Sequence, residues 1–286
     1  MSAPYYSDDA VTLYHGDCLD VMRKLPAQSI DAIVTSPPYG MQRASTYGGI
    51  EQDEYPAWAV SVFEEFKRVL KPSGSVLWNI SPNVKDGVIA DYVLKMRLAI
   101  RNAGWFEHDE LIWVKPDKMP TGKPKWPVRA WESIFWYSLT KDPYVDATKC
   151  GNRITENRRA SAAADPHAFR GRDARLGWDH LGKGYGKMGE FSRAKNHISL
   201  AVRSIGNDVD HPAPFPTELA KWLTRMFTPL GGTVLEPFAG SGTTAEACVI
   251  EGFKCIAIER EAEYMPLIVQ RLTKPMQTAL DLGGTA

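Results

Sequence analysis

The sequence has few cysteines, no net charge and no long apolar run. Its 286 residues include four cysteines without a C-x-x-C pair, which argues against a structural zinc site or a disulfide framework and fits a reducing cytoplasm. No apolar run is long enough to span a membrane, and the N-terminus lacks the basic-then-apolar pattern of a secretion signal. Lys and Arg equal Asp and Glu at 34 each, so a nucleic-acid surface requires local segregation of charge.

Strand-like runs alternate with amphipathic stretches along the chain. Its length suffices for one large α/β domain with an insertion, or for two small domains. The alternation predicts a doubly wound, mostly parallel sheet, which binds ligands beyond the carboxyl ends of its strands. We expect strands over residues 11–15, 31–34, 75–80, 106–115, 131–139, 233–238 and 254–259. We expect helices over residues 18–25, 55–70, 86–102, 217–230 and 261–272, and another from 245 onward.

Two prolines and an aromatic residue follow one of these strands. The stretch Ser36-Pro37-Pro38-Tyr39 comes shortly after the apolar run 31–34. Consecutive prolines donate no ladder hydrogen bonds, so the strand must end there, and their stiff backbone fixes the direction of the carbonyl groups. Rigid acceptors on Ser36 and Pro37 beside the flat face of Tyr39 suit a planar group that carries an NH₂, such as a nucleobase. The alternative is a proline-rich turn that only ends the strand.

A glycine-rich turn joins a second strand to a helix in the C-terminal part of the chain. Residues 239–244 carry two glycines between small and hydroxyl-bearing residues, after the strand-like run 233–238. A strand, a glycine turn and a helix together present free backbone N–H groups to an anionic ligand group. Glu259 ends the next strand about twenty residues later, where an acid can accept hydrogen bonds from ribose hydroxyls. Alone, the turn would indicate only a tight connection.

These two motifs together resemble those of DNA amino-methyltransferases, which take a methyl group from S-adenosylmethionine. The residues that carry the resemblance are Ser36-Pro37-Pro38-Tyr39 and the run from Phe238 to Thr244. The catalytic tetrapeptide lies N-terminal to the cofactor loop, as in the permuted β-type order of that family. The resemblance covers nearly the whole chain apart from a middle segment. It implies a Rossmann-like methyltransferase fold in which both motifs share one crevice.

The resemblance also implies which residues form the site. Asp17 would bond the adenine amino group of the cofactor, and it is compatible with a second role as a helix N-cap. Thr217 is expected both to cap its helix and to lie near the methionine end of the cofactor. No metal is expected. The catalytic residues would be Ser36, Pro37, Pro38 and Tyr39. The cofactor-binding residues would be Asp17, Phe215, Thr217, Glu236, Phe238, Gly240, Ser241, Gly242, Thr243, Thr244 and Glu259.

The middle segment differs in composition from the rest. Between Lys141 and Arg203 there are thirteen basic and seven acidic residues, little apolar content and many glycines. The plain interpretation is a solvated surface insertion. We favour a target-recognition region that is basic because it meets DNA phosphates. The expected domains are therefore a methyltransferase domain over 1–140 and 205–286, with a target-recognition insertion over 141–204.

The target base is the sharper question. Members of the family with Ser at the first motif position mostly resemble cytosine-N4 enzymes, so Ser36 favours N4 of a flipped cytosine. The alternatives are adenine N6, an amine of RNA or protein, and a non-catalytic relative that only binds nucleic acid. The expected partner is double-stranded DNA in the cytoplasm. The resemblance also allows a cognate restriction endonuclease, and either a monomer or a homodimer.

Overall fold

The computed structural model describes residues 3–40, 49–85, 87–119, 125–155, 190–202 and 216–274. The chain divides into two compact units. The larger unit comprises Met1–Tyr144 and Asn196–Ala286, and the smaller unit comprises Val145–Lys195. Within the described residues, no helix is long and apolar enough to cross a membrane.

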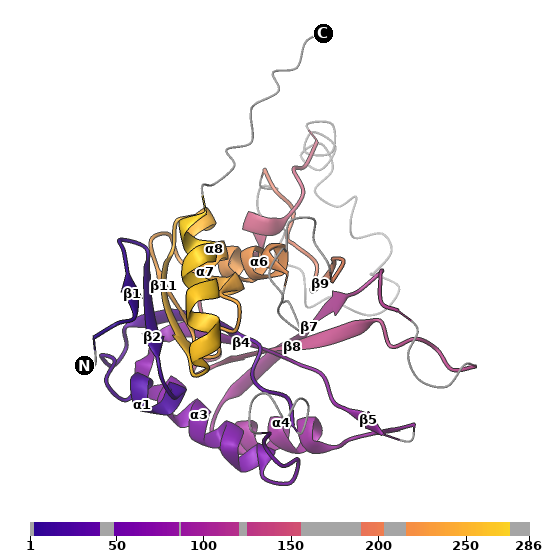
Figure 1. The fold of residues 1–286 in the computed structure, drawn as a ribbon. Helices are drawn as coiled ribbons and strands as arrows, with labels where there is room; N and C mark the ends of the chain where they lie inside the picture. The colour runs from indigo at the N-terminus through magenta and orange to yellow at the C-terminus, as the bar shows by residue number, and fades with distance from the viewer. Residues whose placement is uncertain are drawn as a thin grey trace. The chain divides into compact units, whose positions relative to one another are not determined.

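A sheet of nine strands runs through the larger unit (Figure 1). The strands are β1 (Tyr6–Ser7), β2 (Val11–His15), β3 (Ile30–Thr35), β4 (Leu70–Ile80), β7 (Phe106–Val114), β8 (Trp131–Ser138), β9 (His197–Ser199), β10 (Thr233–Glu236) and β11 (Lys254–Glu259). Their order across the sheet is β1-β2-β11-β10-β3-β4-β8-β7-β9. From β2 to β4 every pair is parallel, whereas β8 is antiparallel to both β4 and β7. The predicted doubly wound, mostly parallel sheet is confirmed.

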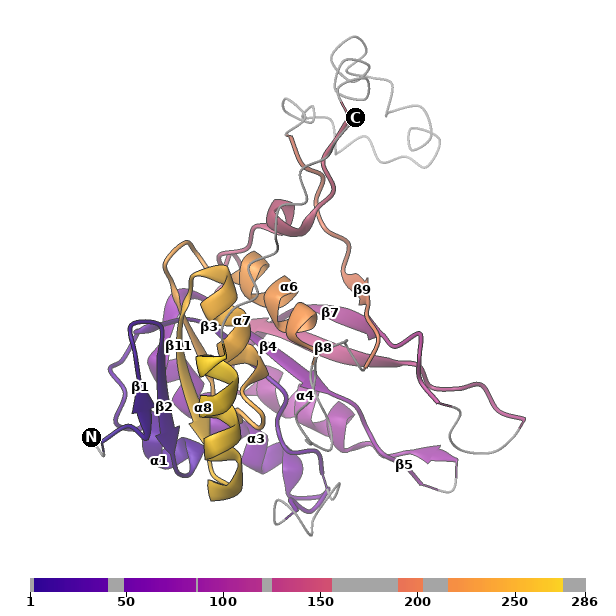
Figure 2. The same cartoon turned by 45° about the horizontal axis from the view of Figure 1, so that its top comes forward.

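Helices cover both faces of this sheet (Figures 1 and 2). The helices α1 (Cys18–Met22), α3 (Tyr55–Val69) and α4 (Tyr92–Asn102) pack on one face. The helices α6 (Thr217–Phe227), α7 (Thr243–Glu251) and α8 (Met265–Thr273) lie on the other, and a 3₁₀ turn, η4 (Ala262–Tyr264), precedes α8. A two-stranded hairpin, β5 (Val84–Lys85) and β6 (Val88–Ile89), comes before α4.

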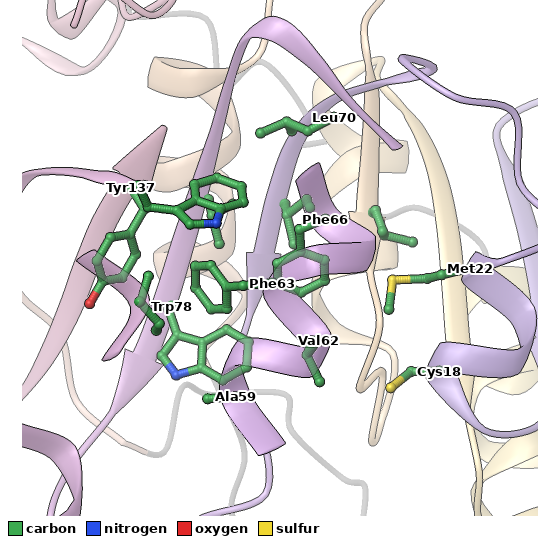
Figure 3. Packing of buried hydrophobic residues seen from close by; sticks show 14 of the residues in the cluster. Cys18, Met22, Ala59, Val62, Phe63, Phe66, Leu70, Trp78 and Tyr137 are labelled. Carbon is green, nitrogen blue, oxygen red and sulfur yellow. The ribbon is translucent and has the colours of Figure 1, made fainter. Parts of the chain in front are cut away.

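The core beneath the sheet is rich in aromatic side chains (Figure 3). One face of α3 repeats apolar residues at helical spacing and is buried, and its Phe63 contacts β4 and β8. The Phe63 ring lies 5.2 Å from Trp78 on β4 and 5.3 Å from Tyr137 on β8, measured between ring centres. Burial of each large apolar side chain stabilises the fold by about 2 kcal/mol. The core therefore holds the strands that carry the site in a rigid arrangement.

Two predicted elements begin five or more residues away from the predicted position. The chain passes from α3 into β4 at Leu70, whose extended backbone caps the helix and pairs with Ile30, so the strand begins before the predicted residue 75. The predicted helix over 86–102 begins only at Tyr92. Gly87 adopts φ +85°, a left-handed conformation that suits a tight turn. The residues before α4 therefore belong to the β5–β6 hairpin and not to the helix.

The smaller unit is described at residues 145–155 and 190–195. A short 3₁₀ helix, η1 (Ala147–Cys150), is capped by the Asp146 carboxylate, which accepts from the Thr148 N–H at 3.0 Å. Arg153 pairs with Glu190 at 2.9 Å. Most of the predicted insertion, including residues 156–189, lies outside the described residues. Its segment His197–Ser199 forms β9 and pairs with β7 in the larger unit.

Candidate active site

The strands that lead into the two motifs are neighbours. β3 and β10 run parallel, with Ala32 opposite Val234 and Ile33 opposite Leu235. Ser36 and Phe238 therefore both follow the carboxyl ends of adjacent strands, at one edge of the sheet. This is the edge at which doubly wound sheets bind their ligands. The adjacency that the resemblance implied is confirmed.

Glu236 links the two motifs. One carboxylate oxygen accepts hydrogen bonds from the Thr35 hydroxyl and from the Phe238 N–H at 3.1 Å, and the other accepts from the Thr244 hydroxyl at 2.7 Å. The side chain is almost fully buried, and burial raises the pKa of Glu236 to about 8. Its hydrogen bonds go to the end of β3, to the loop and to the start of α7. Glu236 therefore fixes the glycine turn against the end of the strand that leads into Ser36.

The glycine turn has the backbone geometry of a ligand-binding loop. Gly240 and Gly242 adopt φ angles of +52° and +80°, in the left-handed region that favours glycine. Gly242 is the N-cap of α7, and no side chain caps that helix terminus. The N–H groups at a helix N-terminus attract anionic groups such as a carboxylate. Ser241, Thr243 and Thr244 surround this terminus and are buried.

Glu259 lies beside this loop at the end of β11. One of its oxygens accepts from the Gly240 N–H at 2.7 Å, and the other accepts from the Glu261 N–H at 2.8 Å. Burial raises the pKa of Glu259 above its ordinary value, while these N–H groups oppose the shift. Each carboxylate oxygen has two lone pairs, so both oxygens retain capacity for ribose hydroxyls.

Asp17 comes from the N-terminal side of the chain but lies near the same strand end. The Gly16 N–H donates to the Glu259 carbonyl at 2.9 Å. The exposed Asp17 side chain caps α1, accepting from the Leu19 N–H at 2.9 Å. The predicted N-cap is confirmed, whereas the contact with adenine stays a prediction.

Thr217 is not a helix cap. Pro216 occupies the N-cap position of α6, and Thr217 is the first helical residue. Its hydroxyl donates to Glu246 on α7 at 2.8 Å, and Arg271 on α8 donates to the same oxygen at 2.8 Å. The hydroxyl therefore joins α6 to α7. Phe215, the other predicted neighbour of the methionine end, lies outside the described residues.

The Ser36–Tyr39 stretch is held by side chains from other elements. The Tyr55 hydroxyl on α3 donates to the Pro38 carbonyl at 2.9 Å. The Asn79 amide on β4 lies 3.4 Å from the Ser36 hydroxyl oxygen and 3.2 Å from the Tyr39 hydroxyl oxygen. Burial raises the pKa of Tyr39 well above its usual range, so its hydroxyl stays protonated. The stretch is therefore an anchored wall of the site.

Comparison with known proteins identifies the family. A family model named for N6 and N4 methyltransferases, and described as DNA methylase, matches residues 30–270. The chain belongs to this DNA methylase family. As a member, it is an S-adenosylmethionine-dependent methyltransferase that acts on an amino group in DNA.

Two curated relatives and one solved structure are similar to this methylase over most of its length. The Type II methyltransferase M.PvuII of Proteus hauseri is 29% identical over 281 residues, covering 92% of this chain and 83% of the relative. The DNA adenine methyltransferase YhdJ of Escherichia coli (strain K12) is 26% identical over 286 residues, covering 93% and 84%. The solved structure of the PvuII DNA methyltransferase (cytosine-N4-specific) matches with a TM-score of 0.72 at 25% identity, over 94% of this chain and 88% of that one.

Three polar residues that the sequence does not single out are linked to the Ser36–Tyr39 stretch by hydrogen bonds. Asn79, Lys115 and Glu132 lie at the ends of strands that the sequence analysis treats as structural. The sequence signal is a polar residue within or beside an apolar stretch: Asn79 between Trp78 and Ile80, Lys115 after Val114, and Glu132 after Trp131 at the start of its stretch. Such residues are common at sheet edges, so the pattern gave no reason to bring them together.

Proposed function

We propose that this methylase transfers the methyl group of S-adenosylmethionine to the exocyclic N4 of a cytosine flipped out of double-stranded DNA. The observation that carries the proposal is the adjacency of β3 and β10. It puts Ser36, which favours cytosine, at the same sheet edge as the glycine turn and Glu259. The similarity to a cytosine-N4-specific structure supports the same base.

The cofactor half binds and orients the methyl donor. The N–H groups at the start of α7 would hold the methionine carboxylate, and Glu259 would accept from the ribose hydroxyls. Asp17 would accept from the adenine amino group. Among the described residues, Thr217, Phe238, Ser241, Thr243 and Thr244 would line this half, and Glu236 contributes by holding the loop in place.

The acceptor half prepares the nucleophile. The exocyclic amine of cytosine is a poor nucleophile because its lone pair is delocalised into the ring. The Ser36 hydroxyl and the Pro37 carbonyl would accept its N–H hydrogens and draw the nitrogen towards tetrahedral geometry. The nitrogen would then attack the methyl carbon of the bound donor, the carbon–sulfur bond would break with its electron pair remaining on sulfur, and the amine would release a proton to solvent. Holding the amine in line with the methyl group supplies much of the rate.

Tyr39 would stack on the flipped base. Extruding a base costs a few kcal/mol, and stacking on an aromatic ring offsets part of that cost. The Ser36–Tyr39 wall is anchored before the base arrives, so little ordering is left for the binding step. The basic middle segment would contact DNA as the target-recognition region, in an enzyme that acts as a monomer or homodimer beside a cognate restriction endonuclease.

Adenine N6 is the second candidate, favoured by the similarity to YhdJ. The two are separated by incubating the purified protein with S-adenosylmethionine and mixed-sequence duplex DNA, followed by digestion to nucleosides and mass spectrometry. We expect N4-methylcytosine. N6-methyladenine would show that Ser36 does not decide the base. No methylated nucleoside, with cofactor binding intact by calorimetry, would contradict the proposal and favour a role in binding only.

A further inference from the structure

Five polar residues at the acceptor edge form one hydrogen-bonded group. We call Ser36, Tyr39, Asn79, Lys115 and Glu132 the acceptor network. The Tyr39 hydroxyl donates to Glu132 at 3.0 Å, and the Asn79 amide donates to the same Glu132 oxygen at 3.1 Å. The Lys115 ammonium donates to the other Glu132 oxygen. Glu132 therefore receives donors from three elements of the chain.

Strand register explains how these residues meet. Thr35 on β3 lies opposite Trp78 on β4, so Ser36 follows beside Asn79. Asn79 lies opposite Ile134 on β8, and Glu132 is two residues from Ile134 on the same side of that strand. On β7, Trp113 lies opposite Glu132, and Lys115 follows two residues later. The network is a row that crosses four neighbouring strands diagonally, near one end of the sheet.

The charged pair in this row is largely removed from water. The Lys115 side chain is 9% exposed and the Glu132 side chain is 18% exposed. The ammonium also lies 4.1 Å from the centre of the Trp113 ring. A buried ion pair is a costly way to gain stability, since apolar residues of similar size usually serve as well. Stability alone therefore does not account for the pair.

We propose that Glu132, held in place by Lys115, is a positioning residue for the Tyr39 ring and, through Asn79, for the Ser36 hydroxyl. In this proposal Glu132 acts through Tyr39 and Asn79 rather than on the base, because one of its oxygens accepts hydrogen bonds from both of these side chains and the other accepts from Lys115. Instead, it fixes the Tyr39 hydroxyl and so the plane on which the base would stack. The inference rests on the proposed function of Ser36 and Tyr39.

Three variants test the proposal in DNA methylation assays with radiolabelled S-adenosylmethionine and mixed-sequence duplex DNA. The double variant Lys115→Met/Glu132→Leu removes the pair without leaving an unpaired buried charge. Tyr39→Phe keeps the ring and removes its anchor. Each should lower turnover by about tenfold or more, because misplacing a reacting group by about 1 Å can cost a hundredfold. Cofactor affinity by calorimetry should stay at the wild-type value. The triple variant should be no slower than the slower of these two variants, because both remove the same constraint on the Tyr39 ring.

Glu132→Gln keeps an acceptor for the Tyr39 hydroxyl and should recover part of the turnover lost in the double variant. It also serves if the double variant does not fold. Glu107→Gln is the matched control. It alters a carboxylate that pairs with Arg97. Glu107 precedes Lys115 by eight residues on β7, which is roughly 26 Å of extended chain at about 3.3 Å per residue. We expect it to leave turnover unchanged.

The outcomes separate this inference from the proposed function. Wild-type turnover in both Glu132 variants, or effects of the Tyr39 and pair variants that multiply in the triple variant, would overturn the inference and leave the function standing. A wild-type protein that methylates no DNA would overturn the function. The positioning claim is then decided by urea unfolding of the same variants: coupled shifts in midpoint support it, and additive shifts contradict it.

Discussion

The cofactor half and the acceptor half of the site are built in different ways. In the cofactor half, Glu236 bonds Thr244 eight residues away, and Glu259 bonds Gly240 nineteen residues away. In the acceptor half, Tyr39 bonds a residue 93 positions further along the chain. The cofactor half is thus assembled largely from one strand–turn–helix–strand unit, whereas the acceptor half depends on the register of four strands. A local sequence motif can therefore predict most of the cofactor half, but only part of the acceptor half.

The largest expected effect concerns Glu236, which joins the two halves. Its folded-state pKa of about 8 lies above the usual 4.5, so the folded protein holds a proton that the unfolded chain releases. The free energy of unfolding should therefore fall as pH rises between about 4.5 and 8, on the order of a few kcal/mol. Glu236→Gln should flatten this fall. Urea unfolding from pH 5 to 9 measures it, with the exposed Glu263→Gln as control. Equal slopes in wild type and Glu236→Gln would contradict the assignment.

Ser36→Ala should disable the acceptor half alone. Loss of the hydroxyl removes one of two acceptors for the amine, so turnover should drop about a hundredfold. Cofactor affinity should remain nearly unchanged, because Ser36 has no described contact with the glycine turn or Glu259. Methyl-transfer rates and calorimetry check the two expectations. Ser61→Ala, which removes an exposed helix hydroxyl on α3, should match wild type. A large loss of cofactor affinity in Ser36→Ala would mean that the two halves are not separable.

Glu259→Ala should have the opposite signature. Hydrogen bonds to a charged group contribute about 1.5–3 kcal/mol, so the dissociation constant of S-adenosylmethionine should rise at least about tenfold. Turnover at saturating cofactor should fall less than in Ser36→Ala. Calorimetry measures the affinity, with Glu261→Ala as the neighbouring control. Unchanged affinity in Glu259→Ala would contradict its assignment to the ribose.

The smallest effect compares two glycines at opposite ends of α7. Gly242 and Gly252 have similar φ angles of +80° and +74°. A Cβ on Gly242 would lie 2.9 Å from Ile268, whereas a Cβ on Gly252 would meet nothing within 4 Å. Both alanine variants should lose about 1–2 kcal/mol from left-handed strain, and Gly242→Ala should lose more. Urea unfolding tests this, and equal losses would show that α8 yields to the new methyl group.

Much of the fold could be predicted because its signals are local. The strands that lead into both motifs are short apolar runs, and the buried face of α3 repeats at helical spacing. The helix over 86–102 was partly wrong because Gly87 allows a hairpin that helical spacing does not reveal. The sequence predicts Thr217 as a helix cap, and this prediction is wrong because Pro216, with its extended backbone, occupies the cap position.

The site divides along the same line. The motif residues could be named from the sequence, and the adjacency of their strands followed from the resemblance. The sequence does not reveal Asn79, Lys115 and Glu132 as site residues, because cross-strand register brings them together. A shift of one residue in the pairing of β8 would turn Glu132 to the other face of the sheet. No single segment contains that information.

The position of β3 also has a consequence for synthesis of the chain. β3 is central in the finished sheet, yet its neighbour β10 follows about 200 residues later, as the Thr35–Glu236 separation of 201 shows. At roughly 5–20 residues per second, a ribosome needs about 10–40 s to cover that distance. During this time the apolar β3 has one unpaired edge, of the kind that aggregates with other chains. Because β4 pairs with the opposite edge of β3, the edge that faces β10 is covered only after the cofactor half has been synthesised.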